Sequence, residues 1–115
     1  MAIKFANNAQ TTLASGITAS DTTLSVNDAS DFPTLASGDH CYLTLEDLSG
    51  NVEIVKATAI SGSSITVARG QDGTTAQAFS QDDFVQLRLT AAGLNELSTD
   101  EEANATAVAL AIALG

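Results

Sequence analysis

The chain has 115 residues, 44% hydrophobic but only 4% aromatic, and its 14 acidic and 4 basic side chains give a formal net charge of −10. This length fits one domain with its own core. Neutralising phosphates requires clustered Lys and Arg, so the charge excludes nucleic acid as an expected partner and disfavours an anionic membrane surface. No apolar run approaches the ~18–20 residues that span a bilayer, and the N-terminus does not resemble a secretory signal.

Short β-branched or alternating segments, separated by turn residues, occupy most of the chain. We expect extended segments at 11–20 (broken by Gly16), 22–27, 40–46, 52–60, 65–69 and 84–89. Turns rich in Ser, Asp, Asn and Gly separate them at 19–21, 47–51 and 61–64. The pattern predicts a mainly β fold: a small antiparallel β-sandwich or barrel with a C-terminal α-helix. The expected organisation is an N-terminal arm at 1–10, a β-domain at 11–97 and a helix at 98–115.

The pattern predicts that the segments at 40–46 and 52–60 form a hairpin. On the second of them, one face carries Val52, Ile54 and Lys56, and the other carries Glu53, Val55 and Ala57. Phe32, one of few aromatics, is expected to fill one end of the core, because Pro33 holds it extended.

No residue pattern predicts catalysis, a cofactor or a metal. His40 is the single histidine and Cys41 the single cysteine. Neighbouring side chains on a strand point to opposite faces, so these two do not form a base and nucleophile pair. We expect Cys41 to be a buried structural thiol. The acidic residues near Asp28 lack the alternate spacing of a calcium-binding loop.

The segment after the strand at 65–69 contains two glycines and no apolar anchor. It lacks the lysine of a phosphate-binding loop and the three-glycine dinucleotide pattern. We therefore interpret Arg69, Gly70, Asp72 and Gly73 as a structural turn. Both glycines are expected at positive φ, with Arg69 holding the turn through backbone carbonyls or Asp72.

The C-terminal segment differs from the rest. Residues 90–97 are compatible with a short helical turn, and Ser98 with Glu101 predicts the start of a helix. From Ala103 onward the sequence is nearly all apolar. Two assembly stripes are expected on this helix: Val108 with Ile112, and Leu110 with Leu114. The helix packs either against its own domain or into a neighbouring subunit or bundle.

The string Ile65-Thr66-Val67-Ala68-Arg69-Gly70-Gln71-Asp72-Gly73-Thr74-Thr75-Ala76-Gln77-Ala78 resembles a motif of tailed-bacteriophage virion proteins, in which a strand ends in RGQDGT or RGQEGT. The segments 17–26, with Phe32-Pro33, and 85–97 resemble the same module, so the likeness covers roughly 11–97 in consistent order. The resemblance implies an N-terminal attachment module of tail fibres or related appendages. A fibre protein continues into a shaft and receptor-binding tip, whereas this sequence stops at Gly115, so we expect attachment rather than receptor recognition.

These observations predict a non-enzymatic structural protein of a phage virion, made in the bacterial host cytoplasm. We expect an oligomeric attachment or adaptor module of the tail, fibre or baseplate, with a trimer favoured and other virion proteins as partners. The alternative is a decoration protein of the head surface. A carbohydrate or host-surface binding module is a further alternative, disfavoured because Tyr42 and four Phe are the only aromatics available to stack on sugars.

Overall fold

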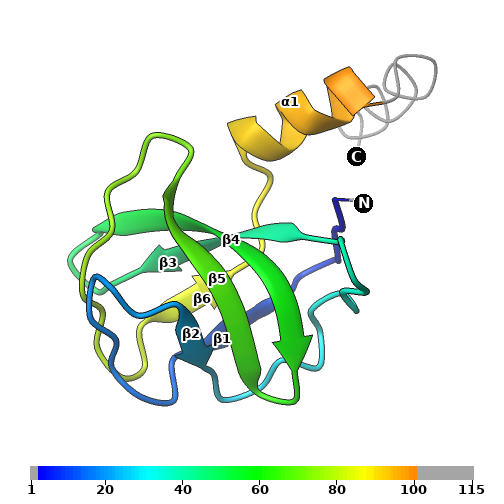
Figure 1. Cartoon of the computed structure of the whole chain (residues 1–115). Coiled ribbons are helices and arrows are strands. Elements are labelled where there is room, and N and C mark those ends of the chain that lie inside the picture. The colour runs from blue at the N-terminus through cyan, green and yellow to red at the C-terminus, as the bar shows by residue number, and fades with distance from the viewer. Residues whose placement is uncertain (1–2, 101–115) are drawn as a thin grey trace.

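The computed structural model describes residues 3–100. Six strands form one antiparallel sheet, followed by one short helix (Figure 1). The strands are β1 (Gln10–Thr12), β2 (Thr23–Ser25), β3 (Cys41–Glu46), β4 (Val52–Ser61), β5 (Ser64–Gln71) and β6 (Phe84–Gln86), and the helix is α1 (Ala91–Asp100). Their order across the sheet is β1-β6-β3-β4-β5-β2. The predicted mainly β fold with a C-terminal helix is confirmed.

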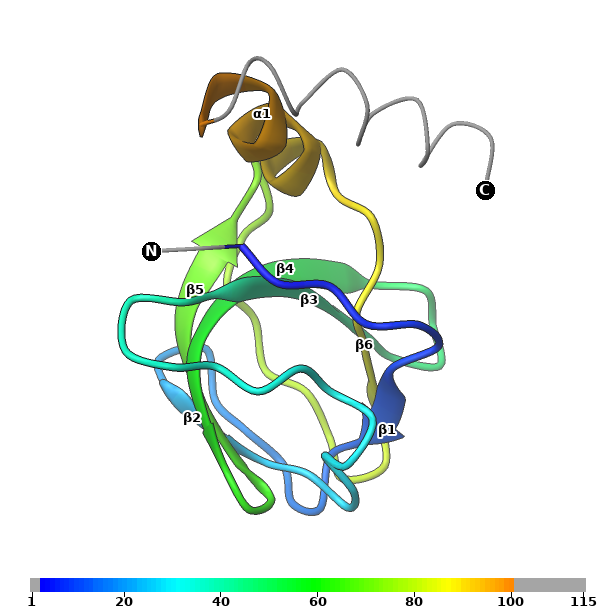
Figure 2. The ribbon, with the colours of Figure 1, turned by 90° about the vertical axis from the view of Figure 1, so that its right-hand side faces the viewer.

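The sheet curls into a half-barrel (Figure 2). The long strands β4 and β5 pair with register shifts between Ile54 and Lys56 and between Ala57 and Ala59. Such bulges bend a strand and increase its twist. These irregularities therefore lie in the pair of strands that crosses the strongly curved part of the sheet.

The two outermost strands meet and hydrogen-bond to each other. Just past β1, Leu13 forms an antiparallel bridge with Val26, which follows β2. The Ala14 N–H donates to the Ser25 carbonyl at 2.8 Å, and the Asn27 N–H donates to the Thr12 carbonyl at 2.9 Å. This seam joins the ends of the sheet and encloses the core.

The inner face of the half-barrel is lined by aliphatic side chains at alternate positions. The fully buried ones are Leu13, Leu24, Leu43, Leu45, Val55, Ile65 and Val85. Phe32 is buried in this core, as expected, and so is Cys41. The hairpin predicted between 40–46 and 52–60 is β3 paired with β4, with Leu43 opposite Val55.

Several expected boundaries were wrong. The extended segment at 11–20 contributes only the end of β1, and the strand expected at 84–89 ends at Gln86. Conversely, β5 continues through Gly70 to Gln71, so the predicted loop begins later. The expected arm at 1–10 is attached to the barrel: Ile3 bridges His40 in parallel, and Gln10 already belongs to β1.

The helix begins seven residues earlier than Ser98. Thr90 caps it, because its Oγ1 accepts the Gly93 N–H at 3.1 Å. Ser98 lies inside α1 and does not cap its start, so that prediction was wrong, and the boundary placed between 97 and 98 cuts through the helix.

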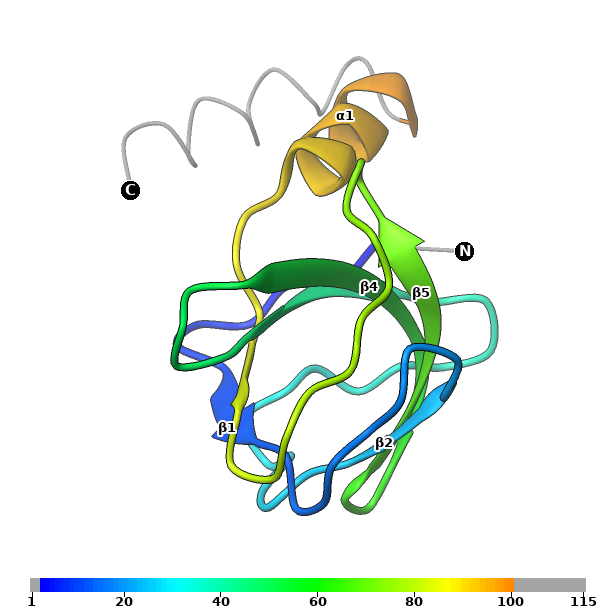
Figure 3. The same ribbon diagram turned by 90° about the vertical axis from the view of Figure 1, so that its left-hand side faces the viewer.

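The expected assembly positions Val108, Leu110, Ile112 and Leu114 lie outside the described residues, as does Glu101. Over residues 3–100, no helix combines the length and apolar character needed to cross a membrane. α1 stands over one end of the half-barrel, joined to β6 by the extended segment 87–90 (Figures 1 and 3).

Candidate functional site

A buried ion pair occupies the segment that the sequence singles out. Glu53 follows the inward alternation of β4 with Val55 and Ala57, and all three are fully buried. Arg69 follows the inward alternation of β5, two residues after Val67. The two neighbouring strands thus bring a carboxylate and a guanidinium together inside one end of the half-barrel. We call these two side chains and the groups bonded to them the Arg69–Glu53 cluster.

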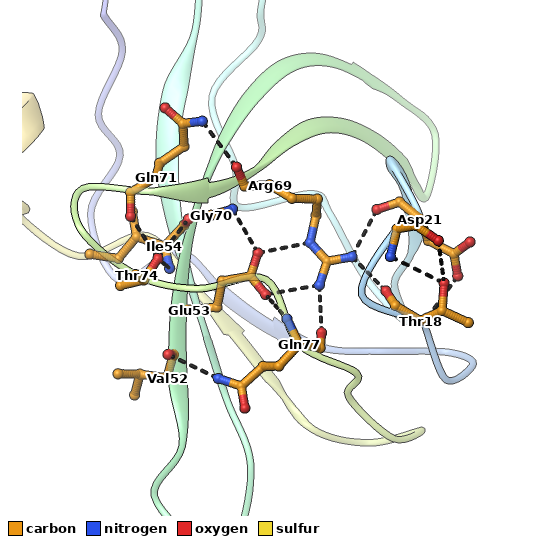
Figure 4. Close-up of polar contacts among 11 residues, drawn as sticks. Thr18, Asp21, Val52, Glu53, Ile54, Arg69, Gly70, Gln71, Thr74 and Gln77 are labelled. Carbon is orange, nitrogen blue, oxygen red and sulfur yellow. Dashed lines mark hydrogen bonds and ion pairs between the residues drawn. The ribbon is translucent and has the colours of Figure 1, made fainter.

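The carboxylate of Glu53 accepts four hydrogen bonds (Figure 4). Arg69 donates from Nε to Oε2 and from Nη2 to Oε1, both at 2.8 Å, in a bidentate fork. The backbone N–H groups of Gly70 and Gln77 donate to the same two oxygens at 2.9 Å. Burial acts to raise the pKa of Glu53, but these hydrogen bonds and the charge of Arg69 outweigh it, so the pKa lies below its ordinary value.

The remaining N–H groups of Arg69 bind backbone carbonyls. Nη1 donates to the carbonyls of Thr18 at 2.6 Å and Asp21 at 2.8 Å, and Nη2 donates to that of Gln77 at 2.6 Å. A guanidinium has five N–H donors, and all five are used here. One side chain therefore ties together β5, β4, the 18–21 turn and the segment that follows β5.

The loop after β5 is closed by its own polar groups. Gly70 and Gly73 have φ values of 61° and 77°, the positive values expected for them, and Asp72 has a φ of 52°. The Thr74 hydroxyl donates to the Gln71 carbonyl at 2.6 Å and accepts the Ile54 N–H at 2.9 Å. These bonds hold the loop after β5 against β4.

The structure divides the predicted turn residues between two tasks. Arg69 binds backbone carbonyls, one of the two arrangements expected for it. All five of its N–H groups are used in other hydrogen bonds, so none is available to bind Asp72. Asp72 instead faces the helix, where its Oδ2 accepts the Ala92 N–H at 3.3 Å. A carboxylate near the N-terminus of a helix is stabilised by the positive end of the helix dipole.

Sequence reasoning missed Glu53 as the partner of Arg69. The available signal was the alternation on 52–57, which places Glu53 on the same face as two apolar residues. A carboxylate on a buried face needs a cation, and Arg69 is the cation on the inner face of the next strand. The signal was ambiguous, because the opposite face of the same segment carries Val52 and Ile54.

A second polar contact joins the helix to the barrel. The Glu96 carboxylate lies 2.5 Å from His40 Nε2 through Oε2, and the Tyr42 hydroxyl donates to its Oε1 at 2.6 Å. His40 and Tyr42 are both buried, and their rings meet edge to face. We call this arrangement the Glu96 contact. The histidine therefore serves in a contact between elements 56 positions apart in the chain.

The Glu96 contact shifts two acidities. Burial acts to raise the pKa of Glu96, but the hydrogen bonds from Tyr42 and His40 and the nearby positive charges outweigh it, leaving the pKa below its ordinary value. Burial, the bond to Glu96 and the charges of Glu96 and Asp72 raise the pKa of Tyr42 to about 12. Both shifts favour a carboxylate bound by a neutral phenol.

The remaining reactive side chains are committed to the fold as well. Burial raises the pKa of the Cys41 thiol to about 12, far from the thiolate that nucleophilic chemistry requires. Within residues 3–100, no three His, Cys, Asp or Glu side chains gather as a metal site would require, and each fully buried side-chain polar atom has a hydrogen-bond partner. These polar groups hold segments of the chain together, because they form their hydrogen bonds with one another.

Comparison of the sequence with protein-family models and with curated proteins gave no match.

Proposed function

We propose that this chain is a structural protein of a tailed-phage virion, an oligomeric attachment or adaptor module of the tail, fibre or baseplate. The resemblance of residues 11–97 to the attachment module of tail-fibre-like proteins supports the proposal. The structure adds a reason for the motif's residue types, because the Arg69 and Asp72 side chains bind separate parts of the fold and Gly70 has a positive φ.

The Arg69–Glu53 cluster is the observation that carries the proposal. A catalytic site keeps polar groups available for a substrate, whereas here all donors of Arg69 and all four acceptor positions of Glu53 bind the protein itself. Such a cluster holds a small domain in one shape, which is what an attachment module requires.

The composition of the C-terminal segment supports assembly. Residues 103–114 are almost entirely apolar in sequence and follow α1 after two acidic residues. Packing against other copies of the chain, most simply in a trimer, would remove these side chains from water. In this proposal the stripes formed by Val108 with Ile112 and by Leu110 with Leu114 face the neighbouring subunits.

Oligomerisation is tested by size-exclusion chromatography with light scattering on the full chain. We expect an oligomer, with a trimer favoured, which Leu110→Asp converts to a monomer. Thr106→Asp is the matched control, because it adds the same charge at a position that is already polar, and it should leave more of the oligomer intact. A full chain that is monomeric, or an oligomer insensitive to Leu110→Asp, contradicts the proposed role of the segment.

The place in the particle is tested by cryo-electron microscopy of phage particles that carry the gene. Density for the half-barrel on the tail, fibre or baseplate supports the proposal. Density on the head surface would instead show a decoration protein, and purified particles that lack the protein would overturn a virion role.

A further inference from the structure

The first six residues of α1 bury little apolar surface against the barrel. Among residues 91–96, Gly93 is buried, whereas Leu94 is 37% exposed. A Cβ at Gly93 would lie 3.3 Å from Ile3 Cδ1 and 3.5 Å from Phe5 Cζ, so the helix approaches the N-terminal segment through a residue without a side chain. Hydrophobic burial by these described residues is therefore small, and the polar contacts carry a large share of the docking energy.

One segment connects the barrel to the helix, and part of it is attached to the barrel. Segment 87–90 belongs to no strand or helix; Leu89 is exposed within it, whereas Leu87 packs against the core and Arg88 pairs with Glu46. Thr90 caps α1 from inside this segment, and Asp72 Oδ2, in the loop after β5, accepts the Ala92 N–H at 3.3 Å. Figures 1 and 3 show the helix above one end of the sheet.

We propose that Glu96 is a latch: its carboxylate, bound by His40 and Tyr42, holds α1 on the barrel, and protonation of that carboxylate releases the helix. Release would let α1 move relative to the barrel. The latch concerns the isolated protein and does not depend on the proposed virion role.

Charged groups surround the latch from every element near it. His40 and Tyr42 approach from the start of β3, Lys56 adds a positive charge from β4, and Asp72 adds a negative charge from the loop after β5. Next to His40, Asp39 pairs with Lys4 at 3.9 Å. The bonds to Oε1 and Oε2 both favour an ionised carboxylate, so adding a proton to Glu96 weakens the two together.

Amide hydrogen exchange of the full chain at neutral pH tests the latch. We expect Glu96→Gln to speed exchange of the α1 amides by about two- to five-fold, the factor that a partly exposed ion pair supplies. The amides of β3 and β4 should keep their protection, which shows that the variant is folded. Unchanged α1 protection in Glu96→Gln overturns the proposal.

Glu46→Gln is the matched control. Glu46 is also a carboxylate in a short contact with a cation, Arg88, and its side chain is 31% exposed against 30% for Glu96. It removes the same charge from the barrel instead of from the helix. Its α1 exchange should equal that of the wild type, and an acceleration as large as that of Glu96→Gln would contradict a specific latch.

Release by acid is followed through Tyr42, the single tyrosine in a chain without tryptophan. Its fluorescence reports directly on the hydrogen bond to Glu96. We expect a step on acidification with a midpoint below the ordinary carboxyl pKa of 4.5, absent in Glu96→Gln and preceding the loss of β3 and β4 protection. A step of equal size in Glu96→Gln overturns release by protonation.

Discussion

The Arg69–Glu53 cluster and the Glu96 contact each join distant segments through a carboxylate, yet they differ in how completely the carboxylate is enclosed. Glu53 is fully buried and accepts four hydrogen bonds, whereas the Glu96 side chain is 30% exposed and contacts His40 and Tyr42. A buried, saturated pair cannot be opened without stranding a charge in the core. A peripheral pair can open to water. The comparison separates a fixed joint within the barrel from a releasable one between barrel and helix.

The largest effect is expected when the fixed joint loses its cation. Arg69→Met keeps an apolar stem but leaves Glu53 buried without a counter-charge, which should lower the free energy of unfolding by about 3–5 kcal/mol. Urea denaturation measures the loss. Adding Glu53→Leu to this variant should recover part of the stability, because no charge then remains buried. A loss below about 1 kcal/mol for Arg69→Met would show that the pair is not a joint of the barrel.

A smaller effect is expected from the turn glycines. Gly70→Ala places a Cβ at positive φ, 3.4 Å from the Ala76 nitrogen and the Thr74 carbonyl oxygen. Gly73→Ala is the matched variant, since Gly73 also has positive φ but nothing lies within 4 Å of its added Cβ. The left-handed conformation costs a non-glycine residue about 1–2 kcal/mol. In thermal unfolding, Gly70→Ala should lower the melting temperature more than Gly73→Ala does. Equal melting temperatures would contradict the inference that an added Cβ is crowded at Gly70.

The smallest effect is expected in the acid dependence of global stability. The folded pKa of Glu96 lies below its ordinary value, so its stabilising contribution is present above the ordinary carboxyl pKa and is lost as pH falls through the lowered one. Glu96→Gln removes this contribution. Between pH 7 and pH 3, the free energy of unfolding of the variant should therefore fall by about 0–1 kcal/mol less than that of the wild type. Urea midpoints across this range measure the difference. A steeper fall in Glu96→Gln would reverse the assigned sign.

Local patterns in the sequence predicted the elements that local forces determine. The alternation on 40–46 and 52–60 with the turn between them is contained in a short stretch of chain, and β3 and β4 form there with little error. The same local logic misplaced the helix start, because Thr90 and Ser98 are both good caps and only the surrounding structure selects one.

Contacts between distant residues were harder to predict. Arg69 was expected to hold its turn through backbone carbonyls or Asp72, but its partner Glu53 depends on which face of β4 turns inward and on β5 lying beside it. Glu96 and His40 had no shared sequence signal, since 56 positions separate them. Pairwise contacts of this kind follow from the curvature of the sheet, which alternation alone does not determine.

The seam between β1 and β2 has a consequence for how copies of this protein meet at high concentration. The outermost strand of a sheet usually presents unpaired N–H and carbonyl groups that can capture a strand of another molecule. Here the N–H groups of Ala14 and Asn27 and the carbonyls of Thr12 and Ser25 are already bonded across the seam. Strand addition at these groups is therefore blocked, which protects against amyloid-like stacking. Association through side chains is thereby favoured, where sequence can specify the partner and the number of subunits.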